Sequence, residues 1–211
     1  MDYFFDVIIL IAAISFFGIF HTYLASLKVK SYLRQNFTGI LPFYRLIYNF
    51  ISLLIIYLFY IYLPQPDLTI YDLIKPFDFI ILGFQFLSLL GFIWCFKYFS
   101  FKEFVGISQI KRWYKRNYNL NDLDEKLTLK IKGPYKYMRH PVYFFSIMFL
   151  IFRPTMDLTY LTLVIMFILY FYVGSYYEEK KLLEIFGEEY SEYQKAVPRM
   201  FPLKPFHPYN V

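Results

Sequence analysis

Residues 139–156 read RHPVYFFSIMFLIFRPTM. Between Pro141 and Arg153 lies an apolar run of about eleven residues, which as a helix would be only ~17 Å long. A bilayer core is ~30 Å thick and needs about 20 such residues. Pro141 suits the first position of a helix, and Pro154 ends one, so we predict a short helix over 141–152.

Longer apolar segments lie on both sides of this run. Four are long enough to cross a bilayer: 4–24, 43–63, 77–99 and 156–177. The last follows the short helix after only a few residues, so the two should pack as an antiparallel hairpin. We predict that this helix continues to Phe186, stops at Gly187, and is followed by an amphipathic helix over about 188–196. The fold class is therefore all-α, a polytopic membrane protein with about five transmembrane helices.

The composition agrees with a membrane protein. Of 211 residues, 58% are hydrophobic, 25% aromatic and only 18% charged, whereas soluble domains carry roughly 25% charged residues. The net charge is +6, but the basic residues lie in short loops between apolar spans, which argues against a nucleic-acid partner. The single cysteine, Cys95, excludes an intrachain disulfide, and no metal-ligand spacing is visible. The first span lacks a basic leader and a cleavage site, so we expect it to be retained.

Loop charges predict the orientation. The first loop carries Lys28, Lys30, Arg34 and Arg45, and the third carries Lys111, Arg112, Lys115, Arg116, Lys130, Lys132, Lys136 and Arg139. The second is mainly acidic, with three aspartates against one lysine. The positive-inside rule places the N-terminus outside and the C-terminus in the cytoplasm.

We expect a single domain over 1–211. It would comprise an N-terminal three-helix part (1–105), a cytoplasmic loop (106–132), and a part with the hairpin and the C-terminal helix (133–202) that carries the candidate site.

Two polar stretches flank the predicted hairpin. GPYKYMRHPVY, 133–143, opens a helix whose first amides, with Arg139 and His140, form a potential anion site. Alternatively, Arg139 is only a positive-inside flank and His140 a helix cap. At the other end, Glu178 and Glu179 stand at the membrane boundary, where carboxylates are costly unless paired or functional. The alternative there is local pairing, such as Glu178 with Lys181 three residues later on the helix.

Taken together, these stretches predict a site for a zwitterion. Its carboxylate would face Arg139 and His140, and its ammonium would face Glu178 or Glu179. The methionine part of S-adenosylmethionine has this charge pattern, and its sulfonium is a cation that aromatic faces attract. Nearby tyrosines can supply such faces.

The same motifs, GPYKYMRHPVY followed by EEKKLLEIFGEEYSEYQKAVP, resemble the isoprenylcysteine carboxyl methyltransferase superfamily. The stretches FGIFHTYLASLKVKSYL, FYRLIYN, FVGISQI and RPTM are similar to its NnrU-like and methanethiol S-methyltransferase branch. The resemblance implies that S-adenosylmethionine enters from the cytoplasm and contacts Tyr135, Arg139, His140, Pro141, Tyr143, Glu178 and Glu179. One departure is that Phe144-Phe145 stand where many members have Leu-Gly or Val-Gly, which calls into question the close packing that a glycine permits.

The predicted function is S-adenosylmethionine-dependent methylation, with a small thiol such as methanethiol as acceptor. A thiol needs little activation near neutral pH. His21 is the candidate base or acceptor-site group, with Arg45 and its neighbours Tyr44, Tyr48 and Asn49 lining the same cavity; alternatively, His21 is an interfacial residue.

Other functions stay open. One alternative is a prenylcysteine carboxylate or a phospholipid amine as the acceptor. The other is a non-catalytic NnrU-like carrier or assembly factor. We expect a prokaryotic inner membrane as the location, with membrane lipids as partners.

Overall fold

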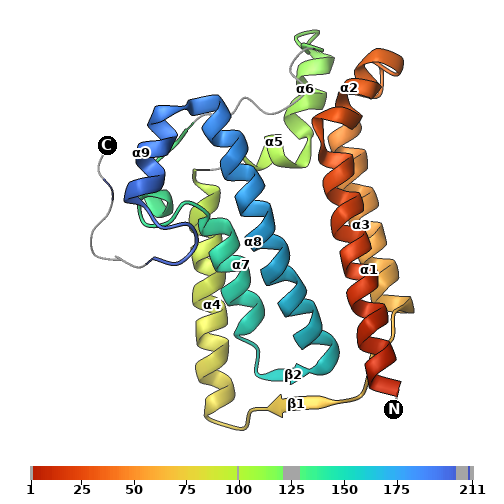
Figure 1. Cartoon of the computed structure of the whole chain (residues 1–211), viewed down its shortest axis with the longest axis vertical. Coiled ribbons are helices and arrows are strands. Elements are labelled where there is room, and N and C mark those ends of the chain that lie inside the picture. The colour runs from red at the N-terminus through yellow and green to blue at the C-terminus, as the bar shows by residue number, and fades with distance from the viewer. Residues whose placement is uncertain (1, 99, 121–128, 203–208, 210–211) are drawn as a thin grey trace. The chain divides into compact units, whose positions relative to one another are not determined.

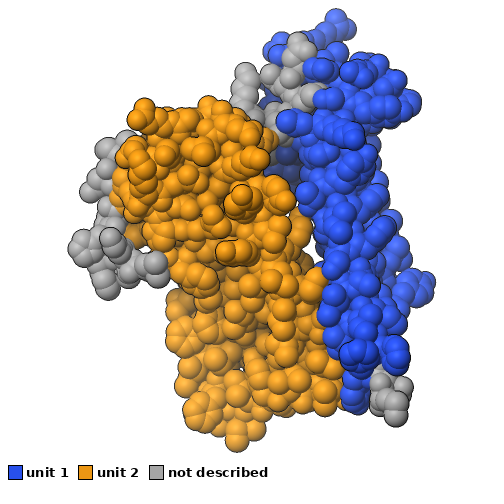
Figure 2. Space-filling model, in the orientation of Figure 1, with its two compact units in different colours: residues 1–64, 100–128 blue, residues 65–99, 129–211 orange. Residues whose placement is uncertain are grey.

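The computed structural model describes residues 2–98, 100–120, 129–202 and 209 (Figure 1). Parts of two predictions, residue 99 of the span 77–99 and residues 121–128 of the loop 106–132, lie outside the described residues. The chain divides into two compact units, one of residues 1–64 and 100–128 and the other of residues 65–99 and 129–211 (Figure 2). We call them unit 1 and unit 2 and describe each by itself.

Unit 1 is helical. It contains α1 (Asp2–Ala25), α2 (Leu27–Asn36), α3 (Tyr44–Tyr62), α5 (Phe101–Val105) and α6 (Ile107–Tyr114). Helix α2 begins where the Ser26 side chain accepts a hydrogen bond from the Val29 amide, which satisfies one of the open donors of the first turn. Helices α1 and α3 contact each other, and α5 contacts α3.

Unit 2 holds the remaining elements. These are β1 (Thr69–Asp72), α4 (Phe77–Phe96), the 3₁₀ turn η1 (Gly133–Lys136), α7 (Pro141–Ile151), β2 (Thr155–Asp157), α8 (Leu158–Phe186) and α9 (Glu188–Ala196). Pro141 is the first residue of α7, as predicted, and α8 ends at Phe186 before Gly187. The predicted helix over 188–196 is also confirmed.

Among the described residues, four helices are long and apolar enough to cross a membrane: α1 from Tyr3, α3, α4 and α8. The prediction of four long spans is thus confirmed. Helix α7 is apolar but has only 11 residues, so a fifth crossing stays a prediction.

The described part of the chain is mostly helical, as predicted, and the two short strands are an addition that was not predicted. Strand β1 pairs with β2 in antiparallel register, with Tyr71 opposite Met156 and Asp72 opposite Thr155. The Thr155 hydroxyl also donates to the Asp72 carboxylate at 2.6 Å. The strands are short and lie more than 80 positions apart in the chain, so no local pattern indicates that they meet.

Helix α7 packs against α4 along its whole length. The rings of Phe84 and Phe152 stack at 5.2 Å, and the Gln85 side chain donates to the Phe149 carbonyl at 3.1 Å. Nearer the other end of α7, the Phe145 ring lies against Gly91, where a Cβ would overlap the ring. The two helices therefore do approach each other closely at a glycine. The glycine is on α4, however, and the large side chain, Phe145, is on α7, where many relatives of this kind have the glycine. Helix α4 belongs to unit 2 together with α7, while the division of the chain into 1–105, 106–132 and 133–202 stays a prediction.

Helix α8 contacts the other side of α7. The Tyr143 and Phe171 rings stack at 4.8 Å, and the Tyr160 hydroxyl donates to the Leu150 carbonyl at 3.0 Å. The start of α7 thus lies near a late part of α8, and the end of α7 lies near the start of α8 (Figure 1).

We expect Gly91→Ala to destabilise the protein by about 1–3 kcal/mol, because the added methyl forces the Phe145 ring out of place. Thermal unfolding in detergent would show a lower Tm. The matched control is Gly83→Ala on the same helix, where a Cβ meets nothing within 4 Å. Adding Phe145→Leu to Gly91→Ala should restore part of the loss; equal Tm values for both single variants would contradict this packing.

Candidate functional site

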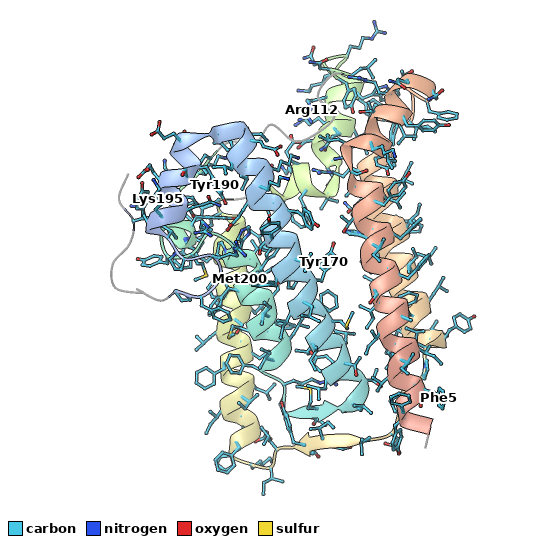
Figure 3. The ribbon with its side chains drawn as sticks, viewed as in Figure 1. Phe5, Arg112, Tyr170, Tyr190, Lys195 and Met200 are labelled. Carbon is cyan, nitrogen blue, oxygen red and sulfur yellow. The ribbon has the colours of Figure 1, made fainter. Side chains whose placement is uncertain are left out.

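The segment that follows α9 docks on the residues just before α7. The Arg139 amide donates to the Pro198 carbonyl at 2.9 Å, and the His140 amide donates to the Arg199 carbonyl at 2.9 Å. Behind these bonds lies a small core of Ile131, Tyr190, Tyr193 and Val197 (Tyr190 is labelled in Figure 3). The start of α7 is therefore fixed against the C-terminal part of unit 2.

Glu179 is the centre of this arrangement. Its side chain is only 4% exposed, and its two oxygens accept from four residues. The donors are Arg139 (2.8 and 3.0 Å), His140 (3.1 Å), Gln194 (3.2 Å) and Arg199 (3.2 Å). A carboxylate can remain ionised in a buried position when charged donors surround it in this way.

The guanidinium of Arg139 also makes several hydrogen bonds. Besides its two-pronged pair with Glu179, its NH1 group donates to the carbonyls of Gln194 and Val197. These carbonyls belong to the last turn of α9 and to the residue after it, where helix carbonyls lack intrahelical donors. Arg139 thus pairs with α8 and caps α9 at the same time.

Glu178 has a different environment from its neighbour. Its side chain is 47% exposed and accepts a hydrogen bond from the Tyr143 hydroxyl at 2.8 Å. The Nδ1 atom of His140 lies 3.5 Å from the same carboxylate. Glu178 therefore keeps an accessible negative charge beside the start of α7.

A row of aromatic rings lies next to Glu178. His140 stacks on Tyr143 at 5.2 Å with an interplanar angle of 6°, and Tyr143 stacks on Phe171. Because Tyr143 is enclosed between the other two rings, it presents its hydroxyl and not an open face to Glu178. The half-exposed carboxylate of Glu178 is therefore the group that attracts an organic cation here. Such a site can hold an ammonium or a sulfonium group.

The structure brings together five of the residues named from the sequence: Arg139, His140, Tyr143, Glu178 and Glu179. Pro141 is buried at the start of α7. The Tyr135 carbonyl accepts from the Tyr193 hydroxyl at 2.6 Å, and burial raises the pKa of the Tyr135 phenol. Direct contact of these residues with a cofactor stays a prediction.

Arg199 and Gln194 were missed by the sequence reasoning. Both donate to Glu179, and the Arg199 guanidinium also lies 5.8 Å from the centre of the Tyr172 ring. One sequence feature could have indicated Arg199: it is a single arginine between Pro198 and Met200, in a stretch that is otherwise apolar. Gln194 lies on a polar helix and carries no comparable signal.

His21 belongs to unit 1 and contacts α3. Its Nδ1 atom lies 3.0 Å from the Ser52 hydroxyl, and its Nε2 atom contacts the Tyr48 hydroxyl. The Ser52 hydroxyl donates its proton to the Tyr48 carbonyl, so its oxygen accepts from Nδ1–H of His21. In a neutral imidazole Nε2 is then the acceptor nitrogen, and the Tyr48 hydroxyl that contacts it also lies 3.3 Å from the His21 carbonyl, to which it can donate instead.

Arg45 also belongs to unit 1, and it contacts the end of α5. Its NH1 group donates to the Glu103 carbonyl at 2.9 Å, and Asn49 donates to the carbonyls of Phe104 and Val105. These are the last carbonyls of α5, so both side chains cap that helix. The predicted role of Arg45 in an acceptor cavity stays a prediction.

The chain is similar to methanethiol S-methyltransferases. It is 40% identical over 68 residues to the enzyme of that name from Pseudomonas deceptionensis, covering 32% of this chain and 26% of the relative. It is 29% identical over 102 residues to the methanethiol S-methyltransferase from Crocosphaera subtropica, covering 47% of this chain and 37% of that relative. The chain thus spans about a quarter to just over a third of these relatives. The predicted resemblance to this branch is confirmed, while no family model and no solved structure matches.

We expect Glu179→Gln to destabilise the protein by about 3–5 kcal/mol, because Arg139 is left buried without its anion. The matched control is the adjacent Glu178→Gln, which removes an equal charge from a half-exposed position and should change stability by less than ~1 kcal/mol. Thermal unfolding of both variants in detergent measures the difference. A similar Tm for the two variants would refute the central role of Glu179.

Proposed function

We propose that the chain is a membrane-bound S-adenosylmethionine-dependent methyltransferase whose acceptor is a small thiol such as methanethiol. The observation that carries the proposal is the half-exposed Glu178 beside the stacked Tyr143 and Phe171 rings, next to a fully engaged Glu179. The similarity to methanethiol S-methyltransferases supports both the reaction and the acceptor.

The residues at the start of α7 fit this cofactor. Glu178 would bind its ammonium group, and the negative charge of the same carboxylate would attract its sulfonium. The first amides of α7, which lack intrahelical acceptors, and the partly exposed Arg199 would bind its carboxylate. Arg139 and Glu179 would then act by positioning His140 and Arg199, and not by direct contact.

The cofactor would supply a methyl group on a positively charged sulfur, which is already a good leaving group. The aromatic rings around Glu178 would exclude water from the reacting atoms. On the acceptor side, the thiol would give its proton to the Tyr48 hydroxyl as that hydroxyl passes its own proton to Nε2 of His21. Free cysteine has a pKa of ~8.5. A simple alkanethiol lacks the electron-withdrawing ammonium group of cysteine and has a higher pKa, so a base that takes its proton would raise the rate at neutral pH.

The proposal includes the membrane arrangement. Helices α7 and α8 would form a hairpin within the bilayer, which brings the membrane helices to five, with the N-terminus outside and the C-terminus in the cytoplasm. The host membrane would be a prokaryotic inner membrane, and the acceptor would arrive from it. The basic first and third loops support this orientation.

An acceptor assay tests the reaction. Purified protein is supplied with tritiated S-adenosylmethionine and, separately, with methanethiol, farnesyl-cysteine or phosphatidylethanolamine. We expect labelled dimethyl sulfide from methanethiol. Label on the prenylated carboxylate or the lipid amine alone would reject the thiol, and no label together with no binding of S-adenosylhomocysteine would favour the non-catalytic carrier.

We expect Glu178→Gln to weaken the binding of S-adenosylhomocysteine about 10–100-fold, because a charged hydrogen bond to the ammonium is lost. Titration calorimetry measures the affinity. The control is Glu184→Gln, an exposed carboxylate farther along α8, which should bind as the wild type does. Unchanged affinity in Glu178→Gln would place the cofactor elsewhere.

His21→Ala should lower kcat about 10²–10⁴-fold at neutral pH if the imidazole is the base, with the affinity for S-adenosylhomocysteine unchanged. Raising the pH toward the pKa of the acceptor thiol should recover part of the loss, since more thiolate then forms without a base. A pH–rate profile of both proteins measures this. A loss that is the same at every pH would indicate a purely structural histidine.

A further inference from the structure

Helices α5 and α6 are held at the start of a candidate membrane span. Arg45 and Asn49, in the first two turns of α3, donate to the last three carbonyls of α5. Between α5 and α6, Gly106 has φ +101°, and a Cβ there would lie 2.9 Å from the Leu46 amide nitrogen. Since α3 begins at Tyr44, these contacts place α5 and α6 at the boundary between membrane and water.

The side chains of this region suit that boundary. Residues 111–116 read KRWYKR, with four cations and no acid. Arg112 (labelled in Figure 3) is paired with Glu103, which lowers the pKa of that carboxyl. Trp113 and Tyr114 are 43% and 75% exposed. Exposed Trp and Tyr among Lys and Arg are typical of segments that lie at the lipid headgroups.

A cavity of about 640 Å³ lies in this region of unit 1. It is lined by residues of the α2–α3 connection, including Thr38 and Pro42, and by residues at and beyond the end of α6, including Trp113, Arg116, Tyr118 and Leu120. The Phe43 and Trp113 rings, 5.1 Å apart, connect the two sides. The volume lies within the range of small-molecule sites, about 300–1,000 Å³.

Arg116 occupies an unusual backbone position at this cavity. Its φ is +56°, in the left-handed region that glycine prefers. Its amide donates to the Trp113 carbonyl, and the next amide donates to the Arg112 carbonyl, which is the pattern of a helix end normally completed by glycine. A cation therefore lines the cavity at a position where glycine would favour folding, as expected of a residue with a binding role.

We propose that this cavity binds the phosphate headgroup of an anionic phospholipid. Arg116 pairs with the phosphate, and the Thr38 hydroxyl and the Trp113 indole N–H are available as further donors. Exposed apolar side chains nearby, including Ile40 and Leu120, offer a surface to the acyl chains. The boundary position of the cavity and this apolar surface favour a lipid over a soluble phosphate.

The test uses the full chain in nanodiscs containing equal amounts of phosphatidylcholine and phosphatidylglycerol. After release into detergent, native mass spectrometry counts the lipids that stay bound. We expect wild type to retain phosphatidylglycerol in preference to phosphatidylcholine, and Arg116→Gly to bind it about fivefold more weakly. Because glycine relieves the positive φ, the Tm of this variant should equal or exceed that of wild type, which separates lost binding from unfolding.

Matched variants complete the design. Lys195→Gln removes an exposed cation of α9 and should retain phosphatidylglycerol as wild type does, while Arg116→Lys should keep most of the binding. Equal retention by wild type and Arg116→Gly would overturn the proposal. Displacement of the lipid by inorganic phosphate would overturn the assignment of a lipid.

Discussion

The buried carboxylate of Glu179 is the constraint on which unit 2 depends. A charge in this position is unfavourable without counter-ions, and its donors come from three separate places: the residues before α7, helix α9, and the segment after α9. Satisfying one carboxylate therefore fixes the start of α7 against both α9 and the chain that follows it. The backbone bonds of Arg139 and His140 to Pro198 and Arg199 reinforce the same junction.

The two adjacent glutamates have different environments because of helix geometry. Consecutive residues of an α-helix point about 100° apart, so Glu179 faces Arg139 while Glu178 lies at the edge of the protein. His140 contacts both carboxylates, through Nε2 and Nδ1 respectively. The imidazole thus connects the buried Glu179 with the half-exposed Glu178. Glu178 is the carboxylate that we propose as the ligand of the cofactor's ammonium group.

Much of the local structure was predictable because strong local signals mark it. Pro141 begins α7, Gly187 follows the end of α8, and the polar stretch 188–196 forms α9. The β1–β2 pair has no such signal, and neither has the contact of Gly91 with Phe145. Both join segments that are distant in the sequence, and only packing in three dimensions brings them together.

By itself, the sequence determined that this is a helical protein with four long apolar spans, and that Arg139, His140, Tyr143, Glu178 and Glu179 are the residues to examine. Hydrophobicity and helix boundaries are local properties, so they can be read along the chain. Only the tertiary structure decided that Glu179 is buried in an ion pair with Arg139, whereas Glu178 remains half-exposed. It also decided that Arg199 and Gln194 take part. Pairing and burial depend on which side chains meet in space, and a linear pattern does not contain that information.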